Sequence, residues 1–432
     1  DMMECFTPDE AGIGVYYENG GLYLVKTYDT IYQKGNAFYT DEACSNAISG
    51  VTTLARAARI AQKIVFVGSY EVTSDETVTI PADKTVTFLR YANFTDISMF
   101  GLNGVTLTLA APDPNSKLII DGNNIETTGA KGSMIYIDSN SSNKLVLKGC
   151  SESTQNIEVR NFRTAMNDSQ YGIGDGGAIC NLGVGAVDAQ NCKFTGNYSN
   201  YGKGGAIYSG AGGTINIQNC TFTGNYTKKD RGGAICSHGS STESTIKNCE
   251  FSDNHALNGA AGGTISIEEG THTISNCNFH DNTAPGLHAG GLHASAGTNT
   301  IENCTFERNK AKWGGAIAFE GDGTNNITNC IMRNNATTGS GGAVDDYNGV
   351  NTYTNCTIEN NTCDSAEGGG FCVNNQSNNV VTFAGKMTII NNKATSGESN
   401  AYCCTSKIMV LASNFSTESK IGVTAQSTDY PV

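Results

Sequence analysis

Proline, tryptophan and charged side chains are scarce in this sequence. Six Pro residues and one Trp occur among 432 residues, and only 16% of the residues are charged. Lys and Arg together number 27 against 41 Asp and Glu, and no basic stripe is present, which argues against nucleic acid as a partner. No apolar run approaches the roughly 20 residues that span a bilayer, so we expect no membrane insertion.

Gly and Cys, in contrast, are frequent, with 52 and 16 residues. Apolar residues recur in a regular pattern along the chain, which argues against disorder. A chain of this length usually divides into several domains, but a repeat protein can use all of it in one elongated body.

Two motifs recur along the chain. The first, N-C-x-(F/I/M)-x-x-N, occurs seven times, with successive Cys residues 26 to 29 residues apart, and this regularity indicates a structural repeat. The second motif, GGAI or a close variant, interleaves with the first, as at Gly204 and Gly232. The first motif begins at Asn191, Asn219, Asn248, Asn276, Asn303, Asn329 and Asn355.

Short alternating runs join the two motifs. TINIQ before Asn219 and HTISN before Cys277 alternate apolar and polar residues, which is typical of half-buried strands. Each repeat therefore holds about three short strands separated by Gly or Asn turns. These features predict an all-β fold, a right-handed parallel β-helix (β-solenoid) of three-strand coils, with neighbouring coils about 4.8 Å apart.

Equivalent residues of stacked coils form rows. The Asn before each Cys can pass an amide hydrogen bond along the stack and tolerates a left-handed turn, so we expect these seven Asn residues to form a buried amide ladder. Stacked Cys residues are poorly placed for disulfides, which need Cβ atoms about 3.8 Å apart, so we expect an interior row of reduced thiols beside a row of Phe rings. The thiol row comprises Cys192, Cys220, Cys249, Cys277, Cys304, Cys330 and Cys356, and the ring row comprises Phe194, Phe222, Phe251, Phe279 and Phe306.

The pairing of GGAI with FxxN resembles the repeat of chlamydial polymorphic outer-membrane proteins and of adhesin-like microbial surface proteins. The resemblance covers residues 161–395 and implies a surface-displayed β-helix that works by adhesion or assembly, at an extracellular location. Proteins of that family usually end in an outer-membrane barrel, and nothing barrel-like is present here, so anchoring by that route is not expected.

Four segments are expected. Residues 1–50 form a small N-terminal appendage, and residues 51–160 hold a capping helix at Val51 to Gln62 followed by irregular first coils. Residues 161–395 form the regular repeats, and residues 396–432 form the last coil and a C-terminal cap. The helix is expected at the N-terminal end because an open end exposes unpaired strand edges.

Parallel β-helices also include polysaccharide lyases and glycosidases, which use clustered carboxylates. The best cluster here is Asp345 and Asp346 beside Tyr347, with Glu320 and Asp322 one coil earlier. We interpret these as solvated turn residues, because no basic partner matches them, and we expect no catalytic residues and no enzymatic activity.

All six His residues lie between His238 and His293. A zinc or nickel site, or a pH-sensitive contact patch, is the alternative to surface histidines. No recognised ligand spacing is present, so we expect surface histidines, with no metal and no cofactor.

Cysteines near the two ends of the chain are candidates for disulfides that pin the caps. Cys5 and Cys44 are the candidate pair at the N-terminal end, and Cys363, Cys372, Cys403 and Cys404 lie near the other. N-x-S/T sequons are candidate glycosylation sites in a secreted chain, and they include Asn93, Asn197, Asn225, Asn335 and Asn414.

The sequence therefore predicts a non-catalytic extracellular or cell-surface protein with a structural or adhesive role. It could be a subunit of a fibre, filament or sheath, through self-association at its ends or through residues 1–50. A monomeric adhesin with host-cell or carbohydrate ligands and a carbohydrate-active enzyme are the alternatives.

Overall fold

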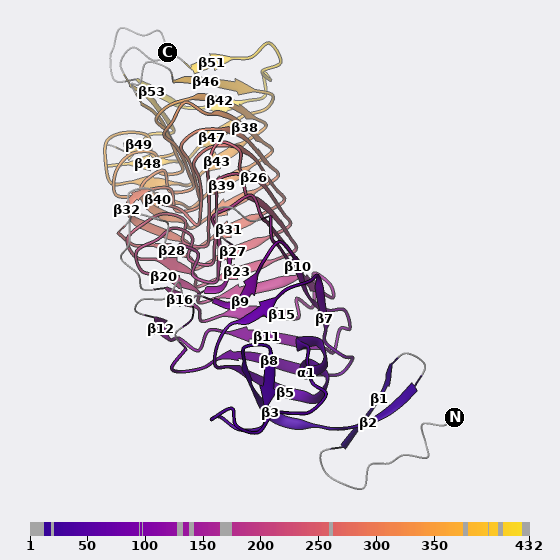
Figure 1. Cartoon of the computed structure of the whole chain (residues 1–432). Coiled ribbons are helices and arrows are strands. Elements are labelled where there is room, and N and C mark those ends of the chain that lie inside the picture. The colour runs from indigo at the N-terminus through magenta and orange to yellow at the C-terminus, as the bar shows by residue number, and fades with distance from the viewer. Residues whose placement is uncertain are drawn as a thin grey trace.

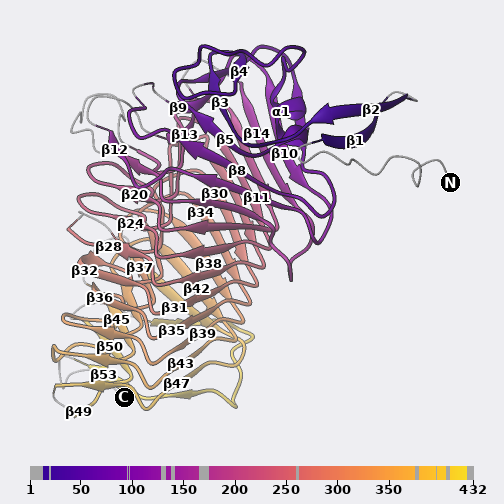
Figure 2. The same ribbon diagram turned by 90° about the horizontal axis from the view of Figure 1, so that it is seen from below.

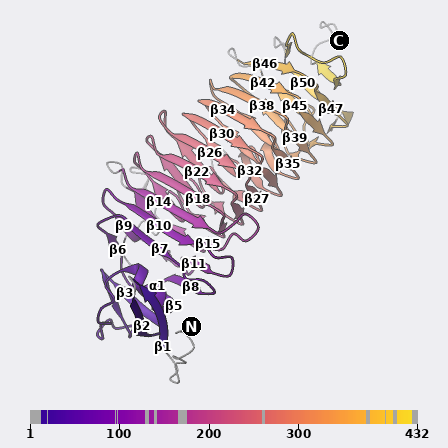
Figure 3. The same cartoon turned by 90° about the vertical axis from the view of Figure 1, so that its right-hand side faces the viewer.

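A computed structural model describes residues 13–18, 21–94, 96, 98–127, 133–137, 142–164, 175–258, 262–374, 379–395, 397–404 and 409–425. Within these residues the chain winds into one elongated body, and its coils stack from the N-terminal to the C-terminal end (Figures 1 and 3). Most strands pair in parallel with a strand of the coil before and a strand of the coil after.

One coil from the middle of the body shows the pattern. It runs through β18 (Ala186–Gln190), β19 (Cys192–Thr195), β20 (Tyr198–Ser199) and β21 (Ile207–Gly210). We call the four sheets I to IV: sheet I contains β18 and has 12 strands, sheet II contains β19 and has 15, sheet III contains β20 and has 11, and sheet IV contains β21 and has 13. The predicted parallel β-helix is confirmed. Each regular coil adds a fourth, mostly very short strand in sheet III to the three strands that were expected.

An Asn corner leads from sheet I to sheet II. After β22 (Thr214–Gln218), in which Ile215 and Ile217 face the interior, Asn219 has a φ of 54°, a left-handed conformation that Asn tolerates. The predicted turn role of the Asn before each Cys is therefore confirmed. The φ angles lie between 51° and 56° at Asn191, Asn219, Asn248, Asn276, Asn303, Asn329 and Asn355.

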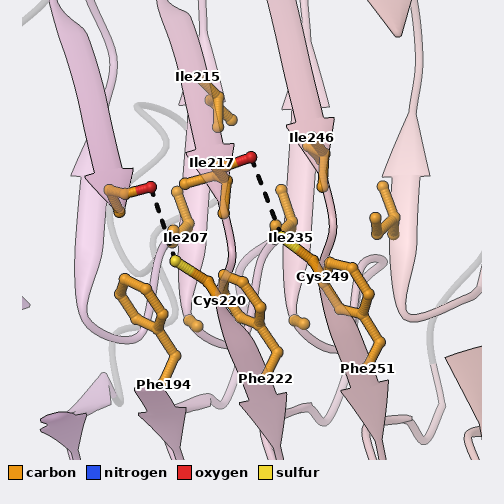
Figure 4. Packing of buried hydrophobic residues seen from close by; sticks show 14 of the residues in the cluster. Phe194, Ile207, Ile215, Ile217, Cys220, Phe222, Ile235, Ile246, Cys249 and Phe251 are labelled. Atoms are coloured by element: carbon orange, nitrogen blue, oxygen red, sulfur yellow. Dashed lines mark hydrogen bonds between the residues drawn. The ribbon is translucent and has the colours of Figure 1, made fainter. Parts of the chain in front are cut away.

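The Cys and Phe side chains that follow this corner point into the body. Figure 4 shows Cys220 and Cys249 beside the rings of Phe194, Phe222 and Phe251. The five Phe rings stack with centroids 4.6 to 4.9 Å apart. Each thiol also donates a hydrogen bond to a nearby carbonyl, as Cys249 Sγ does to Lys247 O at 3.0 Å. The interior position of the predicted Cys row is confirmed, since all seven side chains are no more than 3% exposed, and their reduced state stays a prediction.

The corner Asn side chains do not form the buried ladder that was predicted. Asn276 is exposed, because the corner turns its side chain towards solvent. Asn191, at 5% exposure, is the buried exception. Some neighbours pair at the surface, as Asn248 Nδ2 does with Asn219 Oδ1 at 3.1 Å. Amide hydrogen bonds in contact with water contribute less than buried ones.

The buried ladder belongs to the last Asn of the motif. Asn282 Nδ2 donates to Asn309 Oδ1 at 2.9 Å and to the Phe251 carbonyl at 3.0 Å. Asn282 Oδ1 accepts the backbone N–H of Asn254 at 2.9 Å. The side chain thus links three coils. The members of this row are at most 1% exposed, and they are Asn197, Asn225, Asn254, Asn282, Asn309, Asn335, Asn361 and Asn392.

A short helix, α1 (Leu54–Ile60), caps the N-terminal end as predicted, although it is shorter than Val51 to Gln62. The Thr53 hydroxyl accepts a hydrogen bond from the backbone N–H of Arg56 at 3.3 Å and begins the helix. The helix ends at Ile60 because the chain becomes extended and continues as β5 (Ala61–Phe66). Its apolar face packs on β5 and β7 (Glu76–Thr79).

The predicted boundary at residue 50 does not match the structure. β3 (Tyr28–Lys34) pairs in parallel with β5 and antiparallel with β4 (Ala37–Tyr39), so these residues extend sheet II. Ile31 and Phe38 are buried in the common core. This part of the first segment therefore belongs to the β-helix.

The two ends of the body differ. β1 (Ile13–Glu18) and β2 (Gly21–Lys26) form a separate antiparallel hairpin that projects from the N-terminal end (Figures 1 and 2). At the other end β51 (Met409–Leu411), β52 (Lys420–Ile421) and β53 (Val423–Ala425) are the outermost strands of sheets I, II and IV.

Candidate functional site

Four titratable side chains meet on the outer face of sheet IV, and we call them the His–carboxylate cluster: His288, His293, Glu320 and Asp345. Glu320 Oε1 lies 2.6 Å from His288 Nε2, and Oε2 lies 2.8 Å from His293 Nε2. His288 Nδ1 lies 3.7 Å from Asp345 Oδ2, an ion-pair distance rather than a hydrogen bond. The four residues lie in or beside β32 (Thr283–His288), β33 (Leu292–Ala294), β37 (Ile317–Phe319) and β41 (Val344–Asp346).

Alternation along the strands places these groups outside the core. Leu292 and Ala294 point into the interior, so His293 between them faces the other way. His293 is nevertheless fully buried, and its Nδ1 lies 3.1 Å from the Ser266 hydroxyl of the preceding coil. The half-buried Trp313 ring covers His288, with the ring centroids 4.8 Å apart.

The two histidines of the cluster differ in charge. Burial alone would lower the pKa of His288, but the carboxylates of Asp345 and Glu320 outweigh burial and raise that pKa to about 9. Burial dominates at His293 and lowers its pKa. Burial also works against the ionised form of Glu320, but the two histidines hold its pKa below the usual range. The carboxylate therefore joins a charged imidazole to a neutral one at neutral pH.

A second group on the same face centres on Glu268. Its carboxylate contacts Arg231 Nη1 at 2.9 Å, His238 Nε2 at 3.0 Å and Lys203 Nζ at 3.8 Å. Burial tends to raise the pKa of Glu268, but these three neighbours lower it to about 2. Residues of several successive coils thus neutralise one carboxylate, which ties those coils together.

The carboxylates expected to be solvated are mostly engaged by the protein. Asp346 faces the interior, fully buried, and accepts hydrogen bonds from Tyr353 Oη at 2.8 Å and Asn351 Nδ2 at 2.7 Å. Burial raises the pKa of Asp346 to about 7. Asp345, on the opposite face of the strand, accepts a hydrogen bond from Asn374 Nδ2 at 2.6 Å. The prediction of solvated turn residues was wrong for this pair, because strand alternation separates and buries them.

Asp322 and Tyr347 do lie at the surface, and Asp322 Oδ1 accepts a hydrogen bond from Asn348 Nδ2 at 2.8 Å. The prediction of surface histidines was wrong for His272 and His293, which are no more than 1% exposed. In the part of the chain that the structure describes, no group of three or more His, Cys, Asp or Glu side chains is arranged to hold a metal ion.

A shallow polar groove of about 440 Å³ lies outside the corner between sheets I and II. The turn before β15 (Ile157–Arg160) reaches over later coils, and Gln155 Nε2 donates to the Asn219 carbonyl at 3.1 Å. The groove was not predicted, although the extra residues CSESTQN from Cys150 were a signal for it. Its walls include Glu152, Gln155, Thr221, Asn248, Glu250 and Asn276.

Three of the candidate glycosylation sites are contradicted by the structure. Asn197, Asn225 and Asn335 belong to the buried ladder, and their amides are engaged in hydrogen bonds. A glycan cannot be accommodated there in the folded chain. Asn93 and Asn414 are exposed and stay candidates.

The candidate disulfide gains no support. Cys44 is a free, half-buried thiol whose Sγ lies 3.7 Å from the Glu42 carbonyl. Cys5 lies outside the described residues, so its pairing stays a prediction.

Comparison with known families agrees with this architecture. The family described as right handed beta helix region matches residues 233–415. The Chlamydia polymorphic membrane protein repeat matches residues 191–210 and 219–238, which confirms the resemblance and the right-handed fold class. No curated protein and no solved structure gives a significant match. No helix among the described residues is long and apolar enough to cross a membrane.

Proposed function

We propose that this chain is a non-catalytic, surface-displayed β-helix that self-associates into a structural or adhesive assembly. The observation that carries the proposal is the β1–β2 hairpin, which projects from the body and forms a sheet of its own (Figure 2). The polymorphic membrane protein repeat supports a surface location.

Pairing with another sheet would stabilise the β1–β2 hairpin. An isolated two-stranded hairpin is at best marginally stable in water, and its outer edges carry unpaired backbone groups. Adding a strand to an exposed sheet edge is a common way for β-proteins to associate.

The C-terminal end offers edges of the matching kind. β51 and β53 are outermost strands, and Val410, Leu411 and Val423 are 44%, 57% and 46% exposed. We propose that the hairpin of one copy pairs with this end of the next copy. A contact between two unlike surfaces repeats head to tail and gives a filament when the rotation between copies does not close into a ring.

The acid–base groups support a structural role rather than catalysis. Glu268 and Glu320 are held by basic side chains of neighbouring coils, so the protein itself occupies the positions that a substrate would need. The carbohydrate-active alternative is tested with a panel of acidic polysaccharides, assayed for new reducing ends and unsaturated products. Turnover abolished by Asp345→Ala would overturn the non-catalytic role.

Assembly is tested by removing residues 1–26, which leaves β3 and the rest of sheet II in place. Light scattering and electron microscopy should show assemblies for the full chain and a folded monomer for the truncated one. Val410→Lys, at the C-terminal edge, should also prevent assembly, whereas Val350→Lys, 48% exposed on the flank of sheet I, should not. A full-length chain that stays monomeric at high concentration would contradict the proposal, as would a truncated chain that still assembles.

A further inference from the structure

The outer side of sheet I carries two rows of similar side chains on five consecutive strands, which lie side by side along the body (Figure 3). The second residue of each strand, from His272 in the first to Val381 in the last, is at most 2% exposed. The first and third residues of each strand therefore point outward. The five strands are β30 (Thr271–Ser275), β34 (Thr298–Glu302), β38 (Thr324–Thr328), β42 (Val350–Thr354) and β46 (Val380–Ala384).

The two rows consist almost entirely of β-branched residues, and we call them together the Thr array. The register places the first residues of the five strands next to one another, and it does the same for the third residues. The first row is exposed and consists of Thr271, Thr298, Thr324, Val350 and Val380. The second row is half-buried except at Asn326 and consists of Thr273, Thr300, Asn326, Thr352 and Thr382. Every member except Asn326 therefore carries a γ-methyl group on a branched Cβ whose χ1 is restricted.

The Thr array differs from the rest of the same face. It holds no charged side chain, whereas the equivalent positions of earlier strands include Lys144, Asp188 and Glu243. Val350 and Val380 are 48% and 41% exposed, which is unusual for large apolar residues. Within the part of the chain that the structure describes, no Thr hydroxyl of the array forms a hydrogen bond with another residue. The array thus presents methyl groups and hydroxyls to solvent together.

The β-helix sets the spacing of the Thr array in both directions. Neighbouring coils lie about 4.8 Å apart, and two residues along a strand span about 6.6 Å. The two directions are roughly perpendicular, so the outward groups lie on a nearly rectangular lattice. Water oxygens on the faces of an ice crystal also repeat at right angles, with periods close to these two. The array and an ice face are therefore similar in both directions.

We propose that the Thr array is an ice-binding face, a function beyond the self-association described above. Methyl groups order the water next to them, and the hydroxyls hold that water by hydrogen bonds. The side chains are stiff and repeat in a fixed register, so they lose little conformational entropy on joining the crystal. A charged side chain would keep its own hydration shell and interrupt the ordered water, which is why the lack of charge in the array matters.

The test follows a single ice crystal that is cooled in a solution of the full chain. Adsorbed protein hinders growth, so the crystal should be faceted and should start to grow measurably below its melting point. Thr300→Lys places a charge inside the array and should remove this gap, and Val350→Lys, at an exposed position of the array, should do the same. Thr357→Lys is the matched control, since Thr357 is half-buried on the outer side of sheet II in β43 (Thr357–Glu359), and it should leave the gap unchanged. Circular dichroism should show that all three variants are folded.

Three results would overturn the proposal. The first is a folded full chain that neither separates freezing from melting nor shapes the crystal. The second is a gap of equal size in the array variants and in Thr357→Lys. The third is a loss of self-association in Val350→Lys with no change in the gap, which would make this face a contact between copies. The chain without residues 1–26 should keep the gap, so ice binding and assembly through the hairpin can fail independently.

Discussion

The buried Asn row gives the sharpest test of what holds the coils together. In the variant Asn282→Ala, the fully buried backbone N–H of Asn254 loses the Asn282 Oδ1 acceptor, 2.9 Å away in the parent structure. A buried donor left without a partner costs about 1 to 3 kcal/mol. The lost hydrogen bonds to Asn309 Oδ1 and the Phe251 carbonyl add about 0.5 to 1.5 kcal/mol each, with incomplete additivity. We expect unfolding free energy to fall by about 2 to 4 kcal/mol.

The matched control is Asn276→Gly in the same motif. Asn276 is exposed with a φ of 54°, a conformation that Gly adopts without strain, so the change should stay within about 0.5 kcal/mol. Urea unfolding should be followed by circular dichroism and by hydrogen exchange, because stacked coils can unfold in segments. Equal effects of the two variants, or no effect of Asn282→Ala, would refute the role of the buried row.

Three further predictions concern the interior. Burial lowers the pKa of His272 from 6.5 to about 4, so the unfolded chain takes up the proton first. Stability should therefore fall by roughly 3 kcal/mol between pH 6.5 and 4, and His272→Gln should flatten this part of a pH–stability curve. Phe251→Ala removes a ring whose centroid lies 4.9 and 4.8 Å from those of its two neighbours in the stack, and it should lower the free energy of unfolding in urea by about 3 to 5 kcal/mol. A loss smaller than that caused by Phe251→Leu would contradict the role of the stack. Thiol counting after denaturation should find at least seven reduced cysteines, and sixteen paired ones would contradict the interior row.

The repeat made the architecture predictable, because motif spacing and strand alternation are properties of the sequence alone. The same reasoning predicted the Cys and Phe rows correctly, because apolar side chains that recur at the same position of each coil are expected in the hydrophobic core. It chose the wrong Asn, because both Asn residues of the motif recur at the same interval and only three-dimensional position separates them. Asn276 occupies an exposed turn, while Asn282 is buried in the link between β31 (Asn278–His280) and β32.

The acid–base groups were harder to predict. Glu268, Arg231 and Lys203 lie in different coils, and no spacing rule in one repeat reveals that they meet. Side chains of neighbouring coils also surround groups that face away from the core, as Ser266 and Glu320 do at the buried His293. A period in the sequence fixes which residues stack, but it does not determine what covers the outer side of a strand.

The buried Asn row has a consequence for how such a chain can change its length. Within the row, the Oδ1 of each Asn accepts hydrogen bonds from the Asn of the coil before it, as Asn282 does from Asn254. The Nδ2 group donates to a carbonyl of the coil before and to the Asn Oδ1 of the coil after, so the members inside the row are interchangeable. An in-frame duplication or loss of one 26- to 29-residue unit would leave every remaining hydrogen bond of the Asn row with an equivalent partner. The body would lengthen or shorten in steps of about 4.8 Å, the separation of paired strands. The distance between the projecting hairpin and the far end is thus adjustable in whole coils, without redesign of the interior.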